Sequence, residues 1–82
     1  MYEVVWSERS KKDLECLEKL LIRRIVDKVE GVRAVPHHFL ERLVGSREWK
    51  LRVGDYRVFI DLDDKNKILR VLHVEHRKKA YK

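Results

Sequence analysis

The chain has 82 residues, of which 41% are charged and 44% are hydrophobic, so we expect one domain, residues 1–82, with a thin core. Twenty Lys and Arg against fourteen Asp and Glu give a net charge of +6, which favours an anionic partner such as nucleic acid. The single cysteine excludes an internal disulfide and a cysteine-based metal knuckle. The N-terminus does not have the pattern of a signal peptide, and no apolar run approaches the roughly 18 residues of a membrane span. These features predict a soluble, cytoplasmic protein that does not contact the membrane.

The N-terminal part predicts a short strand followed by two helices. Tyr2, Val4 and Trp6 alternate with polar or smaller residues, as in a strand. After the candidate N-cap Ser7, apolar residues recur at helical spacing up to the candidate stop Gly31: Leu14, Leu17, Leu21, Ile25 and Val29. One helix over residues 7–30 would be about 36 Å long, whereas a compact domain of this size is only about 30 Å across. We therefore expect a break near residues 17–19 and a helical hairpin, with Cys16 packed as a small hydrophobic side chain.

The C-terminal part predicts three strands after a connector. Pro36 ends any helical continuation, and the segment PHHFLERLVGS is typical of a connector with some extended structure. Runs of strand character then cover about 48–53, 55–62 and 67–75, with Gly54-Asp55 as a two-residue hairpin turn. The order β-α-α-β-β-β predicts an α+β fold, an antiparallel sheet with the N-terminal helical hairpin packed on one face.

The hairpin register separates a core face from a charged face. With a two-residue turn, side chains alternate, so an apolar set falls on one side of the ribbon: Trp49, Leu51, Val53, Tyr56, Val58 and Ile60. The other side carries Lys50, Arg52, Arg57 and Phe59. Arg52 and Arg57 oppose each other directly, which is destabilising on a purely structural surface. Two arginines and a lysine beside an aromatic ring suit a phosphate with a base stacked nearby, although an ordinary solvated face is the alternative.

Other polar clusters favour structural roles. His73 and His76 are three apart on a strand and should point to opposite faces, which makes a shared metal site geometrically poor; we expect no metal, and His73 should be a partly buried strand residue. A run of carboxylates is explained by the turn that it enters: Asp61, Asp63 and Asp64.

The segment KLRVGDYRVFIDLDDKNKILRVLHVEHRKKAYK resembles the C-terminal half of RelE-type toxins of the RelE/ParE superfamily, most clearly in LRVGDYRV and HRKKAY. RelE toxins are ribosome-dependent mRNA interferases of toxin–antitoxin pairs. The resemblance covers nearly the whole chain and implies a RelE-like fold. It also implies cleavage of mRNA in the ribosomal A site by attack of the ribose 2′-hydroxyl on the adjacent phosphate, which leaves a 2′,3′-cyclic phosphate. This chemistry uses no metal and no cofactor, and it needs a base, charge relief on the phosphorane and a proton for the leaving oxygen.

The resemblance assigns catalytic roles to five residues. Lys50 matches the family's proposed general base, and neighbouring arginines should disfavour its ammonium form. Arg57 matches the arginine that grips the scissile phosphate, and Arg77 the one that stabilises the transition state or protonates the leaving group. His76 is the better acid of the adjacent pair because its unperturbed pKa lies near neutrality. Tyr81 matches a C-terminal tyrosine that stacks on or orients the substrate.

The remaining expectations concern RNA contact and partners. A set of residues is expected to bind RNA: Arg52, Phe59, Lys78, Lys79 and Lys82. Glu48 stands where the classic family member has a second lysine, and it is itself a possible base. The implied partners are a RelB-like antitoxin, the ribosome and mRNA. The alternative is a non-catalytic, ParE-like toxin that inhibits DNA gyrase by binding.

Overall fold

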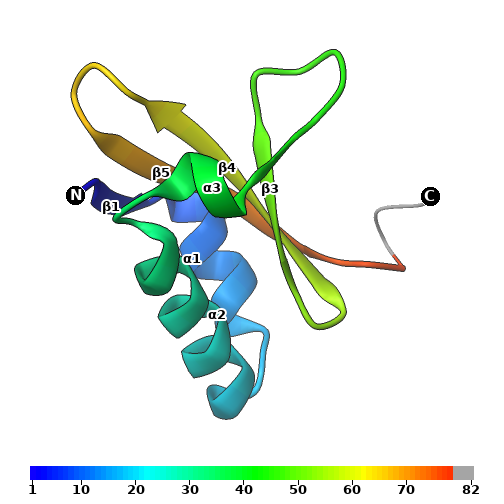
Figure 1. Ribbon diagram of the computed structural model, residues 1–82. Coiled ribbons are helices and arrows are strands. Elements are labelled where there is room, and N and C mark those ends of the chain that lie inside the picture. Colours follow the sequence, from blue (N-terminus) through cyan, green and yellow to red (C-terminus); the bar gives the residue numbers. More distant parts are fainter. Residues whose placement is uncertain (79–82) are drawn as a thin grey trace.

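The computed structural model describes residues 1–78, which form a twisted sheet covered on one face by a helical hairpin (Figure 1). Lys79, Tyr81 and Lys82 lie outside the described residues. The elements, in chain order, are β1 (Glu3–Trp6), α1 (Glu8–Glu15), α2 (Lys19–Val32), α3 (Pro36–Phe39), β2 (Glu41–Arg42), β3 (Trp49–Val53), β4 (Tyr56–Asp63) and β5 (Ile68–His76). The α+β class and the helical hairpin are confirmed. Among the described helices none is long and apolar enough to cross a membrane.

The break between the two helices falls where it was expected, and α1 is tied to the last strand. Ser7 caps α1, because its Oγ accepts a hydrogen bond from Ser10 N at 3.0 Å. The same hydroxyl donates to Leu72 O at 2.6 Å, and Asp13 Oδ2 accepts from Val74 N at 2.9 Å. These bonds fix α1 beside β5. Helix α2 continues through Gly31, so the predicted stop at that residue is wrong by one position.

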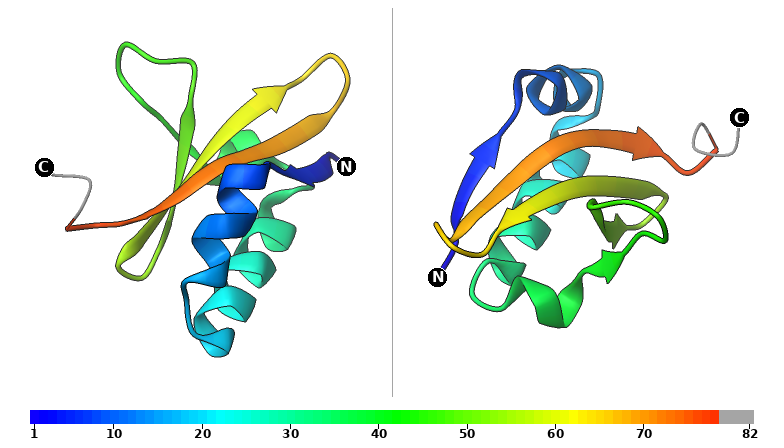
Figure 2. Two further views of the ribbon diagram at one scale, coloured as in Figure 1. Left: turned by 180° about the vertical axis from the view of Figure 1, so that it is seen from behind. Right: turned by 90° about the horizontal axis from the view of Figure 1, so that it is seen from above.

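The sheet has the order β1-β5-β4-β3-β2 and is mixed. Strand β1 pairs with β5 in parallel, whereas the other neighbours are antiparallel. Figure 2 shows β1 and β5 side by side and running in the same direction. The expectation of a wholly antiparallel sheet is therefore wrong for this pair, because the chain joins β1 to β5 through three helices and three other strands, a long connection that allows parallel pairing. The connector forms the short α3, begun by Pro36, and the two-residue β2.

The core lies between α2 and the sheet. Ile25 and Val29 of α2 are fully buried, as are Val58 and Ile60 of β4. Burying each such side chain stabilises the fold by about 1.5–3 kcal/mol before chain entropy is counted. Cys16 does not join this core. It is exposed at the end of α1, so the prediction that it packs as a small hydrophobic residue is wrong.

A β-bulge in β5 sets which of its side chains reach the outer face, the side of the sheet away from the helices. Ile60 pairs with Val71, but Phe59 pairs with His73, so Leu72 is the extra residue. Val71 and Val74 both enter the core, although they are three residues apart. The intervening His73 is thereby placed on the outer face, level with Phe59 and Lys50.

Candidate phosphate-binding site

The β3–β4 hairpin has the register that the sequence predicts. Arg52 pairs with Arg57, and Lys50 pairs with Phe59, so these four side chains share the outer face. The turn is possible because Gly54 has φ +57°, a left-handed conformation that glycine adopts without a side-chain penalty. The hairpin therefore presents two opposed arginines next to a lysine.

Three arginines converge at the tip of this hairpin. Arg52, Arg57 and Arg77 line one small hollow of about 80 Å³ together with the turn. Arg77 is brought there by the end of β5, where its backbone N–H donates to Asp55 O at 2.7 Å. Guanidinium groups bind phosphate oxygens through two parallel hydrogen bonds, and they keep their charge at any physiological pH. The hollow can hold a phosphate group between Arg52 of β3, Arg57 of β4 and Arg77, which directly follows β5.

Lys50 lies on the same face but is held by a carboxylate. Its Nζ is 3.4 Å from Glu41 Oε2, and its side chain is only 13% exposed. Glu41 belongs to β2, which lies in the segment that the sequence predicts as a connector. This carboxylate offsets part of the positive charge that Lys50 brings to the outer face. The pairing puts Lys50 beside the arginine hollow as a positioned cation.

The outer face also holds Phe59, as the hairpin register predicts, together with His73 and two carboxylates that the sequence did not place there. The rings of His73 and Phe59 are stacked, with centroids 4.3 Å apart and an interplanar angle of 18°. His73 Nε2 is 3.6 Å from Glu48 Oε1, and Nδ1 is 3.3 Å from Glu75 Oε1. Nδ1 is buried and makes no hydrogen bond within the described residues. Phe59 therefore offers a base at most one face of its ring, since His73 covers the other.

His76 occupies the opposite face of the sheet. It pairs with Tyr56, and the two rings meet edge-on with centroids 4.9 Å apart. Its Nδ1 accepts a hydrogen bond from Lys78 N at 3.1 Å. His76 lines a groove of about 550 Å³ with Arg9, Asp13 and Cys16, on the helix side. The structure brings Arg52, Arg57 and Arg77 to one hollow, with Lys50 on the same face of the hairpin. His76 faces the helix side and also shares a hollow of about 430 Å³ with Asp55, Arg77 and Lys78. Tyr81 falls outside the described residues.

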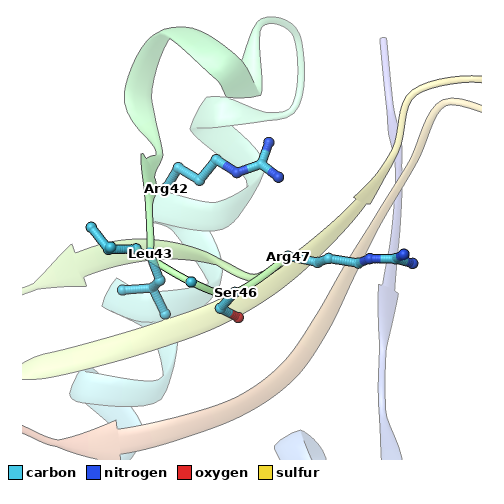
Figure 3. A pocket seen from close by; sticks show the side chains of 6 residues that line it. Arg42, Leu43, Ser46 and Arg47 are labelled. Atoms are coloured by element: carbon cyan, nitrogen blue, oxygen red, sulfur yellow. The ribbon is translucent and has the colours of Figure 1, made fainter.

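A larger hollow lies away from the arginine cluster, over the loop that joins β2 and β3. It measures about 580 Å³ and is lined by the loop itself. Figure 3 shows Arg42 and Arg47 extending to the same side of this loop. Arg42 is already engaged, because its Cζ lies 5.5 Å from the centre of the Trp49 ring. Val44 at the loop tip is fully exposed, so the hollow has no enclosed wall.

No group of three or more His, Cys, Asp or Glu side chains comes together as a metal site among residues 1–78. The charged groups that line the hollow are Arg52, Arg57 and Arg77, with Asp55 as the carboxylate on the turn. Such a site can bind an anion and stabilise additional negative charge that develops on it.

Sequence comparison decides the family. A profile of the ParE toxins of type II toxin–antitoxin (parDE) systems matches residues 4–81. The chain belongs to this toxin family. No curated protein gives a significant match. The expected resemblance to toxins of the RelE/ParE superfamily is confirmed by this match and by the structures below.

Solved structures share the toxin's fold. A chain of the RelBE2 toxin–antitoxin complex from Mycobacterium tuberculosis aligns with a TM-score of 0.83 and 23% identity, covering 93% of this chain and 98% of that one. The archaeal RelE–RelB complex from Pyrococcus horikoshii gives 0.78 and 26%, covering 93% and 94%. The intact Escherichia coli RelBE complex gives 0.77 and 22%, covering 93% and 96%. The toxin is therefore similar in fold to RelE chains from bacteria and an archaeon.

Proposed function

We propose that this toxin is a metal-independent endoribonuclease that cleaves mRNA in the ribosomal A site. The observation that supports this most directly is the hollow where Arg52, Arg57 and Arg77 converge on the outer face, beside Lys50. The proposal treats residues 1–82 as one cytoplasmic toxin domain. It uses the arginines as the groups that bind the scissile phosphate.

The reaction divides into a proton removal, an attack and a proton return. A base takes the proton of the ribose 2′-hydroxyl, the 2′-oxygen forms a bond to phosphorus, and the bond from phosphorus to the 5′-oxygen breaks. Arg57 and Arg77 stabilise the negative charge of the pentacovalent intermediate, and Lys50, two residues from Arg52 on the same face of β3, acts as base or as a further cation. The alternative proton carriers are Glu48 on the outer face and His76 at the sheet end.

The partners follow from the same face. RelE chains of the solved neighbours are found in complexes with RelB antitoxins. We propose that a RelB-like antitoxin covers the cationic outer face with an acidic, amphipathic segment. Ribosomal RNA and mRNA would be the polyanions bound when the antitoxin is absent, with Lys78, Lys79 and Lys82 as additional contacts.

Inhibition of DNA gyrase by binding is the second candidate function. It is favoured by the family match itself, which is to ParE toxins. It is also favoured by Glu41 beside Lys50 and Glu75 opposite Arg57, since both carboxylates reduce the net charge of the proposed site. A toxin of this kind needs no catalytic base.

Primer-extension mapping of mRNA on programmed ribosomes tests the first function. We expect the wild-type toxin to cut within the A-site codon and Arg57→Ala and Arg77→Ala to cut at least about 100-fold more slowly, as is typical when one charge-stabilising group is removed. Arg23→Ala is the matched control, because Arg23 lies on α2 and pairs with Asp27 at 3.9 Å. Absence of cuts by the wild type, together with inhibition of purified gyrase, would establish the second function instead.

A further inference from the structure

An arginine of α2 reaches the same hairpin turn from the helix side. A Cβ built on Gly54 would lie 3.1 Å from Arg24 Nη1 and 3.5 Å from its Cζ. The guanidinium of Arg24 therefore rests against the bare backbone of the turn. Gly54 also lines the hollow formed by Arg52, Arg57 and Arg77, so one glycine separates Arg24 from that hollow.

Arg24 differs from its neighbour in what it contacts. Arg23 forms an ion pair with Asp27 one turn further along α2. Within residues 1–78, Arg24 has no carboxylate at ion-pair distance. Its side chain is exposed, and its guanidinium lies against Gly54. Gathering like charges around one turn costs free energy, and here Asp55 is the carboxylate that lies on the turn. A bound anion with charges on both sides of the turn would offset that cost.

We propose that Arg24 binds a second backbone phosphate of single-stranded RNA, next to the phosphate held by the three arginines of the hollow. The strand would cross the turn at Gly54, where the missing side chain lets two backbones approach closely. This inference rests on the proposed endoribonuclease function. It specifies the path that the bound RNA strand follows beyond the arginine hollow. A polynucleotide fits because its charges repeat along one chain, which satisfies arginines on both sides of the turn.

Binding of a 2′-O-methyl RNA hexanucleotide tests the proposal, because this RNA does not carry the attacking hydroxyl. Fluorescence anisotropy is measured at several salt concentrations for the wild type, Arg24→Ala and Arg23→Ala. We expect Arg24→Ala to weaken binding at least about tenfold, as for one charged hydrogen-bonding group. It should also reduce the slope of log affinity against log salt by about 0.7, the value for one phosphate on a single strand. Arg23→Ala, which removes the same charge one residue away, should change neither quantity.

Neutral backbone linkages identify the phosphate. Each linkage of the hexanucleotide is replaced in turn by an uncharged methylphosphonate. One replacement should weaken wild-type binding but leave Arg24→Ala unaffected, and an adjacent replacement should do the same for Arg57→Ala. If Arg24→Ala responds to every replacement as the wild type does, the contact is refuted.

Three other results would also overturn the proposal. Equal losses of RNA affinity in Arg23→Ala and Arg24→Ala would mean that RNA responds only to the general surface charge. If the wild type shows no saturable RNA binding at low salt, the protein has no RNA site of this kind. Loss of binding to an oligoglutamate peptide in Arg24→Ala, with RNA binding intact, would assign the residue to an acidic protein partner. Full cleavage on ribosomes by Arg24→Ala in any of these cases would leave the proposed function standing while the inference fails.

Discussion

Asp64 joins three segments that are far apart in the chain. Its Oδ1 accepts a hydrogen bond from the Tyr2 hydroxyl at 2.6 Å and lies 2.7 Å from His37 Nε2. The hydrogen bond from Tyr2 is the largest cause that lowers the pKa of Asp64, and the hydrogen bond from His37 is the second. The hydrogen bond to Asp64 also raises the pKa of the Tyr2 hydroxyl. One carboxylate thus ties the start of β1 and the start of α3 to the β4–β5 turn.

The lowered pKa predicts a loss of stability in acid. Because the folded-state pKa of Asp64 lies below its unfolded value, its contribution is present above the unfolded pKa and is lost as the pH falls through the folded one. Asp64→Asn should therefore have a lower Tm than the wild type at pH 6, and the difference should shrink below about pH 4. Thermal unfolding followed by circular dichroism between pH 6 and pH 2.5 measures this. A difference that stays constant over that range would contradict the assignment.

The stacked pair on the outer face should contribute to stability. His73 is only 17% exposed and lies flat on Phe59, so we expect a favourable coupling of about 1 kcal/mol between the two rings. A double-mutant cycle with His73→Ala, Phe59→Ala and the double variant, measured by urea unfolding, gives this energy. A coupling within about 0.3 kcal/mol of zero, the usual error for independent sites, would mean that the stack adds nothing.

At the scale of the elements, the bulge at Leu72 explains what could not be predicted from the sequence. The two-residue turn fixed the register of β3 and β4, so Lys50, Arg52 and Arg57 were placed correctly. Counting back from the β4–β5 turn without a bulge would instead put Leu72 opposite Phe59 and Val74 opposite Arg57. The spacing of three between Val71 and Val74 was a signal of the bulge, because both side chains need the core.

Gly54 in the hairpin turn and Gly31 in α2 should respond to alanine with opposite signs. Gly54 has φ +57° and Arg24 in contact, so Gly54→Ala should destabilise the fold by about 1–2 kcal/mol. Gly31 lies within α2 with no atom near its missing Cβ, and Gly31→Ala should stabilise by up to about 1 kcal/mol. Urea unfolding of both variants checks this pair. Changes of the same sign in the free energy of unfolding would mean that at least one of the two backbone conformations differs from this description.

Across the whole molecule, the helical hairpin was predictable from the sequence, but the position of β5 in the sheet was not. Helical spacing and the length limit gave the hairpin of α1 and α2, whereas nothing local specifies that β5 inserts beside β1. The antiparallel pairing of β5 with β4 carries Arg77 to the turn at Asp55, and the bulge at Leu72 sets which residue arrives there. The arginine hollow was therefore predictable in its two hairpin members. Its third member was expected only through resemblance.

The thin core makes the fold sensitive to single deletions inside it. Ile25 is fully buried, and Ile25→Ala should cost about 2–5 kcal/mol, a large part of the roughly 4–12 kcal/mol that a chain of this length has in total. Leu20 on the same helix is 82% exposed, so Leu20→Ala should change the free energy of unfolding by less than about 0.5 kcal/mol. Urea midpoints compare the two. A similar loss in both would place α2 differently from the structure.

The parallel pairing of β1 with β5 has a consequence for how the toxin is made. The hydrogen-bond partners of three N-terminal features all lie between Ile68 and Val74: those of β1, of the Ser7 hydroxyl and of the Asp13 carboxylate. A nascent chain that has not yet emerged that far cannot close its sheet, and the slow step should be this end-to-end closure. Arg77 can join Arg52 and Arg57 only after this last strand has been translated and docked, so the three-arginine hollow is completed at the end of synthesis.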